Sequence, residues 1–501
     1  MTVGDVLLSL LIAGLLLLVS KFIRMRVAIL RRVFIPGSII AGFLGLLLGP
    51  QVLGWIFARA VGPDTALADG IFPQAVLDSW QSLPGILISV VFAALFLGKP
   101  LPGPREIWHR AGPQVVFGQI VAWGQYVVGI GLALLVLAPL FGTNPIAGAL
   151  IEIGFEGGHG TAAGMAPAFE AAGFEEGTDL ALALATIGLV MGVLIGTVLV
   201  NWAIRTGKVS ITEKGEVHPA SLSPDELDVS VTEKDKKELK KQKRLEISPT
   251  DPLSLHLGIV GLAIALGWLM LQGLRWVESV TWGRPPTPEE IEAALAAGRD
   301  APEALILMAY LPLFPLAMIG GVIIQIIVDR MGWSRFVSRP LMSRICGTAL
   351  DFTIVSALAV LSLAAIGEHL IPVLSLAGIG IAWCVFALVF IAPRIIPFNW
   401  FERGIGDFGQ SMGVTVTGLL LMRMADPENR SQCLESFGYK QLLFEPVVGG
   451  GLFTGMSVGL IAAYGPVSIL TFCAILTVAW LIFGLLYFGP MVREQRAKGQ
   501  L

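Results

Sequence analysis

Two glycine-rich stretches hold the polar side chains of this chain whose types and spacing could do chemistry. The first, at 152–164, has five glycines among the eleven residues from 154 to 164, and the second lies at 404–418. A glycine in a helix interior is about 1 kcal/mol less favourable than alanine, so both stretches predict interrupted helices. The peptide groups freed there could coordinate a small cation or receive a carboxylate. The candidate substrate-binding and ion-binding residues are Glu156, Gly157, Gly158, His159, Gly160 and Thr161 in the first stretch, and Asp407, Gly409, Gln410, Ser411, Gly413 and Thr415 in the second.

The ionisable side chains of this set each have a second interpretation. Glu156 and Asp407 could bind a cation or carry a proton, or they could cap the helices that follow by accepting backbone N–H bonds. His159 could donate to a carboxylate or respond to pH, or it could be a buried histidine with satisfied hydrogen bonds. Asp351 lies outside both stretches, in the apolar run 349–360. Because an acid within a membrane is costly, we predict that Asp351 binds a cation, with Na⁺ as the candidate, or a substrate amine.

The composition excludes an ordinary soluble protein. Of 501 residues, 55% are hydrophobic and 14% are charged, whereas about 25% are charged in a soluble domain. Apolar runs of about 20 residues recur, which is long enough to cross a hydrocarbon core as helices. The predicted spans are 5–23, 34–50, 82–98, 113–140, 178–203, 254–275, 304–328, 346–367, 371–392, 443–464 and 466–489.

Lysine and arginine gather on alternate sides of these spans. Five of them follow the first span and ten lie in the stretch 205–250, while the alternate loops are mainly acidic. By the positive-inside rule, the N-terminus is outside, and the linker at 205–250 and the C-terminus are cytoplasmic. The expected location is the cell inner (plasma) membrane, with several passes. The net charge of −3 gives no reason to expect nucleic acid as a partner.

The second half of the chain resembles the first. A shift of 251 residues places Glu156 and Gly158 over Asp407 and Gly409. Five spans precede the linker, and this odd number inverts the second copy, which is the pattern of alternating-access transporters. We therefore predict an all-α polytopic membrane protein of two inverted-topology repeats, each with five transmembrane helices and a re-entrant hairpin between the fourth and fifth. Its predicted parts are 1–204 with a hairpin at 144–170, a charged linker at 205–250, and 251–501 with a hairpin at 402–426 and one extra last span.

Three stretches resemble the bacterial sodium/glutamate symporter family. They read EGGHGTAAG at 156–164, IPGSIIAGFLGLLLGP at 35–50 and, less closely, GDFGQSMGVTVTGL at 406–419. The resemblance implies two inverted five-span domains, each with a pore loop between its fourth and fifth spans, in a homodimer that imports L-glutamate with Na⁺. It also implies that Gly157, Gly158 and Gly160 are pore-loop glycines. The linker, an insertion at 285–302 and the extra last span depart from the compact members of the family.

These features predict a secondary active transporter that imports L-glutamate with Na⁺ by alternating access. The alternative is a Na⁺- or H⁺-coupled symporter of another organic anion, such as a di- or tricarboxylate, because glycine-rich hairpins bind carboxylates without requiring an amino group. A passive channel would need a continuous pore lined by rings of charge. An enzyme is not expected, because the five histidines are scattered and neither HExxH nor GxxxxGK[ST] occurs. The expected partners are an anionic small molecule, Na⁺ as the coupling ion, membrane lipid and a second copy in a homodimer, without a cofactor.

Overall fold

In the computed structural model, every regular element of the described residues is a helix. These residues are 3–27, 30, 35–99, 101–209, 251–283, 307–308, 310–427 and 429–498. The predicted insertion at 285–302 lies outside them, as does the predicted linker at 205–250 apart from its first five residues.

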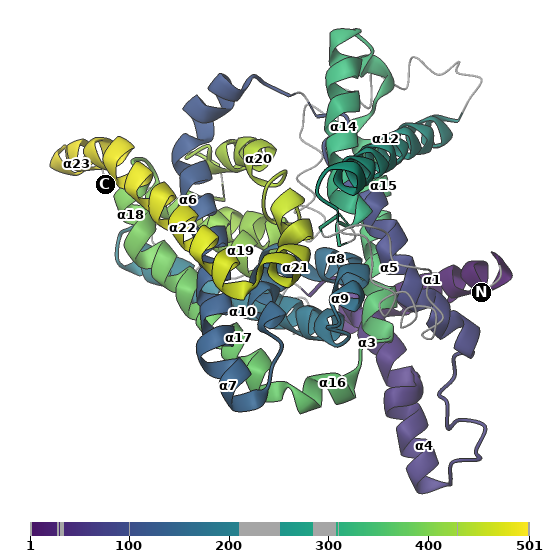
Figure 1. Ribbon diagram of the computed structural model, residues 1–501. Coiled ribbons are helices and arrows are strands. Elements are labelled where there is room, and N and C mark those ends of the chain that lie inside the picture. The colour runs from purple at the N-terminus through teal and green to yellow at the C-terminus, as the bar shows by residue number, and fades with distance from the viewer. Residues whose placement is uncertain are drawn as a thin grey trace.

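The helices form two packed groups (Figure 1). The first group consists of α1 (Val3–Arg26), α3 (Gly37–Leu48), α4 (Trp55–Ala60), α5 (Gln74–Ala94), α12 (Pro252–Thr281), α14 (Leu313–Arg330) and α15 (Arg339–Ala359). The second consists of α6 (Pro104–Leu132), α7 (Ala138–Phe141), α10 (Gly177–Arg205), α17 (Leu370–Phe386), α18 (Ala392–Ile395), α19 (Trp400–Ala425), α20 (Cys433–Phe444), α21 (Leu452–Tyr464), α22 (Pro466–Tyr487) and α23 (Gly489–Ala497). Between them lie α8 (Gly158–Gly164) and α9 (Ala166–Ala171), and α8 contacts α5 and α15 on one side and α10 on the other.

Ten helices of the described residues are long and apolar enough to cross a membrane, five in each half of the chain. They confirm the predicted all-α, polytopic membrane protein. They run over Val3–Arg26, Gly37–Ala60, Gln74–Ala94, Arg105–Phe141, Gly177–Arg205, Pro252–Thr281, Leu313–Arg330, Arg339–Ala359, Leu370–Ile395 and Pro466–Tyr487. The third and fourth begin well before the predicted starts at 82 and 113, because Pro84 and Pro113 lie inside helices. Proline is tolerated within transmembrane helices, where neighbouring groups satisfy the freed backbone.

The predicted span at 443–464 is wrong as a single helix. α20 ends at Phe444 and α21 begins at Leu452, and α21 has only 13 residues. The intervening stretch 445–451 contains a proline and three successive glycines, and Gly449 and Gly450 have φ values of +72° and +96°. Proline removes a helix donor and only glycine adopts positive φ without strain, so this stretch ends one helix before the next begins.

α20 and α21 follow one another along α6. Lys440 of α20 lies against Gly118, and the ring of Phe453 in α21 lies 4.4 Å from the ring of Trp123. α22 runs the opposite way, because Phe472 near its start is close to Trp123, whereas Phe488 at its end lies near the first turns of α6. The chain therefore passes along α6 in two short helices and returns along it in α22.

The two halves share an unusual local feature. A π-helical turn at Ala133–Leu137 leads from α6 into α7, and another at Ala387–Ile391 leads from α17 into α18. The two turns are offset by 254 residues, and an interrupted segment follows each of them. This offset differs from the sequence shift of 251 and places Glu156 opposite Gln410 rather than Asp407.

Candidate functional site

The first interrupted segment bends at its paired glycines. A π-helical turn at Glu152–Glu156 leads through Gly157 into α8, and Gly158 has a φ of +69°. Gly157 also has no room for a side chain, because a Cβ there would lie 2.6 Å from the carbonyl oxygen of Ile153. The bend therefore requires glycine at both positions, because any side chain would be strained at position 158 and would clash at position 157.

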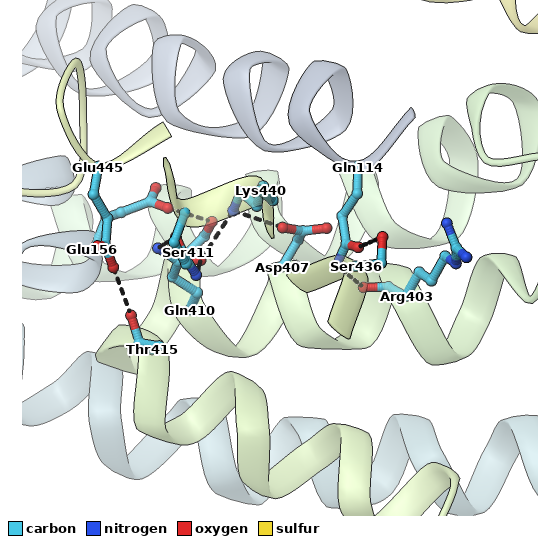
Figure 2. Close-up of polar contacts among 11 residues, drawn as sticks. Gln114, Glu156, Arg403, Asp407, Gln410, Ser411, Thr415, Ser436, Lys440 and Glu445 are labelled. Atoms are coloured by element: carbon cyan, nitrogen blue, oxygen red, sulfur yellow. Dashed lines mark hydrogen bonds and ion pairs between the residues drawn. The ribbon is translucent and has the colours of Figure 1, made fainter. Parts of the chain in front are cut away.

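The second interrupted segment is a helical hairpin within α19. Gly413 and Val414 have non-helical backbone angles, and Val414 has a φ of +57°. The two halves on either side of this point lie against each other, since a Cβ on Gly409 would be 2.6 Å from Cα of Gly418. Figure 2 shows the second half running back beside the first from Thr415 onward. The glycines permit this close antiparallel packing because side chains would hold the two backbones apart.

The bends of the two segments meet. A Cβ on Gly158 would lie 2.3 Å from Cγ1 of Val414, so the side chain of Val414 fills the space where any other residue at position 158 would place its Cβ. One turn away, the Ser411 hydroxyl donates to Glu156 Oε1 at 3.2 Å. Both side chains are almost completely buried, with exposed fractions of 0% and 3%. Residues that are 255 positions apart in the sequence thus share one buried polar contact.

A third interruption, the loop 445–451 between α20 and α21, lies against the same point. A Cβ on Gly449 would lie 3.3 Å from Cγ of Glu156, and a Cβ on Gly450 would lie 2.9 Å from Oγ1 of Thr161. The Thr415 hydroxyl donates to Glu445 Oε1 at 3.3 Å. Three glycine-containing breaks from distant parts of the sequence therefore surround the carboxylate of Glu156.

Glu152 ties this loop to the first segment. Its Oε1 accepts from the Gly449 amide at 2.7 Å and from the Thr454 hydroxyl at 2.8 Å, and its Oε2 accepts from the Tyr126 hydroxyl at 2.5 Å. Both oxygens of this fully buried carboxylate are thus satisfied by protein donors. We infer that Glu152 positions the loop.

Replacing Tyr126 by phenylalanine should test this positioning role. Tyr126→Phe keeps the buried ring and removes the hydroxyl, and a hydrogen bond to a charged group contributes about 1.5–3 kcal/mol to stability. We expect a lower thermal unfolding midpoint for the purified protein. Tyr464→Phe is the matched control, because Tyr464 is 53% exposed. An unchanged midpoint in Tyr126→Phe would show that Glu152 does not need this donor.

A row of buried polar side chains extends from this point along α19 and α20 (Figure 2). Gln410 Oε1 accepts from Lys440 Nζ at 2.9 Å and from Gln441 Nε2 at 2.8 Å. Lys440 Nζ also pairs with Asp407 Oδ1 at 2.6 Å. Near the start of α19, the Gln114 amide donates to the backbone carbonyl of Arg403 at 3.2 Å.

The row leads toward a cavity of about 460 Å³ beside the first turns of α6. Arg403 and Arg110 both line it, together with aromatic side chains from α6, α20 and α22. The polar row thus links this cavity to the meeting point of the three interruptions.

Several buried oxygens near the meeting point lack a hydrogen-bond partner among the described residues. They include Glu156 Oε2, Thr161 Oγ1 and Glu445 Oε2. Such groups are costly unless something pairs with them, so they fit a site for a cation or for a substrate donor. The described residues contain no group of three or more His, Cys, Asp or Glu that could hold a metal ion. A Na⁺ site here would therefore combine carboxylate oxygens with hydroxyl and carbonyl oxygens.

The structure separates some of the predicted site residues from this cluster. The His159 ring lies 3.0 Å from the Thr186 hydroxyl of α10, and Gly160 packs against Ile88 and Leu350. Asp351 lies on the exposed face of α15.

The capping interpretation of the two acids is wrong. Gly157 occupies the N-cap of α8 and no side chain of the described residues caps that helix, so Glu156 does not serve there. Asp407 lies within the first half of α19 and pairs with Lys440 instead.

Five features of the cluster were not predicted from the sequence: Glu152, Lys440, Gln441, Glu445 and the glycines at 449–451. The available signal was the run EPVVGGG at 445–451, with Lys440 one turn earlier in an apolar stretch. Apolar neighbours on both sides concealed it within a stretch of membrane-spanning length.

Comparisons with known proteins find the same family that the sequence motifs resemble. A family model described as Sodium/glutamate symporter matches residues 112–270. The Sodium/glutamate symporter of Escherichia coli (strain K12) is 31% identical over 230 residues, which are 44% of this chain and 51% of that protein. The protein of the same name from Haemophilus influenzae (strain ATCC 51907 / DSM 11121 / KW20 / Rd) is 29% identical over 209 residues, 40% of this chain and 45% of that protein. The matches span about half the length of these curated relatives.

These matches confirm the resemblance to the sodium/glutamate symporter family, which is a family of transporters and not of enzymes. The matched residues 112–270 contain the first interrupted segment and α10. They do not reach α19 or the loop 445–451, so these two elements are assigned to the candidate site from their contacts alone.

Proposed function

We propose that this chain, a relative of the sodium/glutamate symporters, is a secondary active transporter that imports L-glutamate together with Na⁺. The observation that carries this proposal is the meeting of three helix interruptions around the buried carboxylate of Glu156. Interrupted helices expose peptide groups at membrane depth only where these line a binding site or are buried in protein. In transporters, such interruptions hold the substrate and the coupling ion.

The proposed mechanism is alternating access by two inverted repeats, 1–204 and 251–501, with 205–250 as a cytoplasmic tether. The matching π-helical turns and the interrupted segments after them support this repeat. In this arrangement the stretches 144–170 and 402–426 are re-entrant. α20 and α21 together make the fifth crossing of the second repeat, and α22 is the extra last span that returns the C-terminus to the cytoplasmic side. The N-terminus lies outside, in the cell inner membrane, and the protein is a homodimer.

In the proposed site, Na⁺ binds among the oxygens of Glu156, Thr161 and Glu445 that have no hydrogen-bond partner in the described part of the chain. The hydroxyls of Ser411 and Thr415 and the peptide groups at the two bends take part in holding Na⁺ and substrate. Transport is coupled if Na⁺ and glutamate together stabilise a state that can cross over, whereas either one alone does not. Asp351 remains a predicted Na⁺ ligand of a conformation in which α15 lies closer to the cluster.

Uptake into proteoliposomes tests the proposal directly. We expect labelled L-glutamate to accumulate above its equilibrium level when an inward Na⁺ gradient is imposed, and not when choline replaces Na⁺. Unlabelled succinate or citrate at the same concentration should compete poorly with glutamate. Glutamate uptake that ignores Na⁺ would contradict the proposal, and strong competition by citrate or succinate would favour a symporter of another organic anion.

A further inference from the structure

The ammonium group of Lys440 is buried where a charge is costly. The side chain has an exposed fraction of 0%. Its Nζ has two oxygen partners, Asp407 Oδ1 at 2.6 Å and Gln410 Oε1 at 2.9 Å. Its third side faces an aromatic ring, with the Phe444 centroid at 3.7 Å. The ammonium group therefore lies among two side-chain oxygens and an aromatic face.

These partners are of the kinds that bind cations. Carboxylate and amide oxygens are ligands that hard cations prefer, and an aromatic face attracts cations through its quadrupole. The Phe437 ring adds a second, more distant face at 5.5 Å. The same set of groups would suit an alkali cation as well as an ammonium group.

The packing around Lys440 holds the ammonium group in place. Gly118 of α6 lies directly against the lysine side chain, and a Cβ on Gly118 would be 2.6 Å from Cε and 2.9 Å from Nζ. Any larger residue at position 118 would displace the lysine. The chain thus provides a space that fits this one side chain.

The position of the ammonium group connects it to the proposed transport site. Gln410 is its amide partner and is followed directly by Ser411, which donates to Glu156. The side chains of Glu156, Asp407 and Glu445 bring three buried carboxyl groups into the same row. An excess of buried acids requires cations to balance it.

We propose that the Lys440 ammonium group is a tethered cation, which occupies a monovalent-cation site formed by Asp407, Gln410 and Phe444. Because it is covalently attached, it neutralises this part of the row in every state of the transport cycle. Mobile cations are then needed only at the oxygens nearer to Glu156. Removing the ammonium group should convert this position into a site for a small cation from solution.

Lys440→Met tests this inference, since methionine resembles lysine in shape but lacks the charged head. Thermal unfolding of the purified full chain is measured without glutamate, in NaCl, KCl or choline chloride at equal ionic strength. We expect the midpoint of Lys440→Met to fall by several degrees in choline chloride. We also expect NaCl or KCl to restore at least half of this loss, beyond any response of the wild type to the same salts.

The double variant Lys440→Met/Asp407→Asn is the matched control. It removes both charges of the pair, so the additional response to small cations should disappear. If Lys440→Met does not fold, Lys440→Gln replaces it in the same titration, because its amide can still donate to Asp407. A single variant that folds and responds to salts only as the wild type does would overturn the proposal and leave Lys440 as a structural ion-pair partner.

This readout is independent of glutamate transport. If the thermal midpoint of Lys440→Met shows no additional response to NaCl or KCl, the proposal of Na⁺-driven uptake by the wild type is unaffected. Conversely, a failure of the uptake assay would not remove a cation response that appears only in Lys440→Met.

Discussion

Glu156→Gln should reduce Na⁺-driven uptake of L-glutamate by about 100-fold or more. The substitution keeps the size of the side chain, and its amide oxygen can still accept from Ser411. It removes the charge from Oε2, the oxygen that has no hydrogen-bond partner among the residues that the structure describes. In the proposed site this charge pairs with Na⁺. Losing one member of a buried charge pair typically costs about 3–5 kcal/mol, and every 1.4 kcal/mol is about a factor of ten in affinity. Initial rates in proteoliposomes, measured over a range of Na⁺ concentrations, provide the test.

Two other glutamates provide controls for this substitution. Glu170→Gln changes an exposed residue of α9 and should leave uptake unchanged. Glu152→Gln changes a carboxylate whose oxygens are all occupied by protein donors, so it should lower the thermal midpoint as well as the uptake. If uptake by Glu156→Gln is within about threefold of the wild type at every Na⁺ concentration, Glu156 is not part of the binding site.

The first interrupted segment could be predicted from sequence because its signal is local. The glycines at 157 and 158 occur beside an acid within an apolar run, and the structure bends the chain there. The second segment was also recognised from its glycines. Its contacts with the first segment were harder to predict. The sequence shift of 251 residues places Asp407 opposite Glu156, whereas the residue that contacts Glu156 is Ser411. The structural offset of 254 instead follows the π-helical turns, which have no distinctive composition.

The loop 445–451 shows why the third part of the site could not be predicted. Hydrophobic length favoured a single span over 443–464, since α21 and the last turn of α20 are both apolar. What breaks the helix is a proline and three glycines, and what gives the break its importance is a long-range contact of Gly449 with Glu152. The same applies to Lys440, whose partner Asp407 is 33 residues away on another helix. Such pairings depend on how helices pack, which hydropathy does not encode.

Gly158→Ala should abolish Na⁺-driven uptake while the protein still inserts into the membrane. Alanine is strained at a φ of +69°, by roughly 1–2 kcal/mol. Its Cβ would also lie 2.3 Å from Cγ1 of Val414, which is closer than any real contact. Val414 would have to shift away from position 158, and this shift would disturb the nearby contact between Ser411 and Glu156. Proteoliposome uptake, normalised to the amount of folded protein by size-exclusion chromatography, measures the loss.

A second substitution makes this steric explanation specific. Val414→Ala removes Cγ1, and the remaining Cβ of residue 414 would lie 3.7 Å from the new methyl group, an ordinary contact. The double variant Gly158→Ala/Val414→Ala should therefore recover part of the uptake, with the backbone strain at position 158 limiting the recovery. Gly378→Ala is the matched control, because a Cβ at that position in α17 meets no heavy atom of the described residues within 4 Å. If Gly158→Ala and Gly409→Ala both fold and transport normally, the meeting of the two bends is not the transport site.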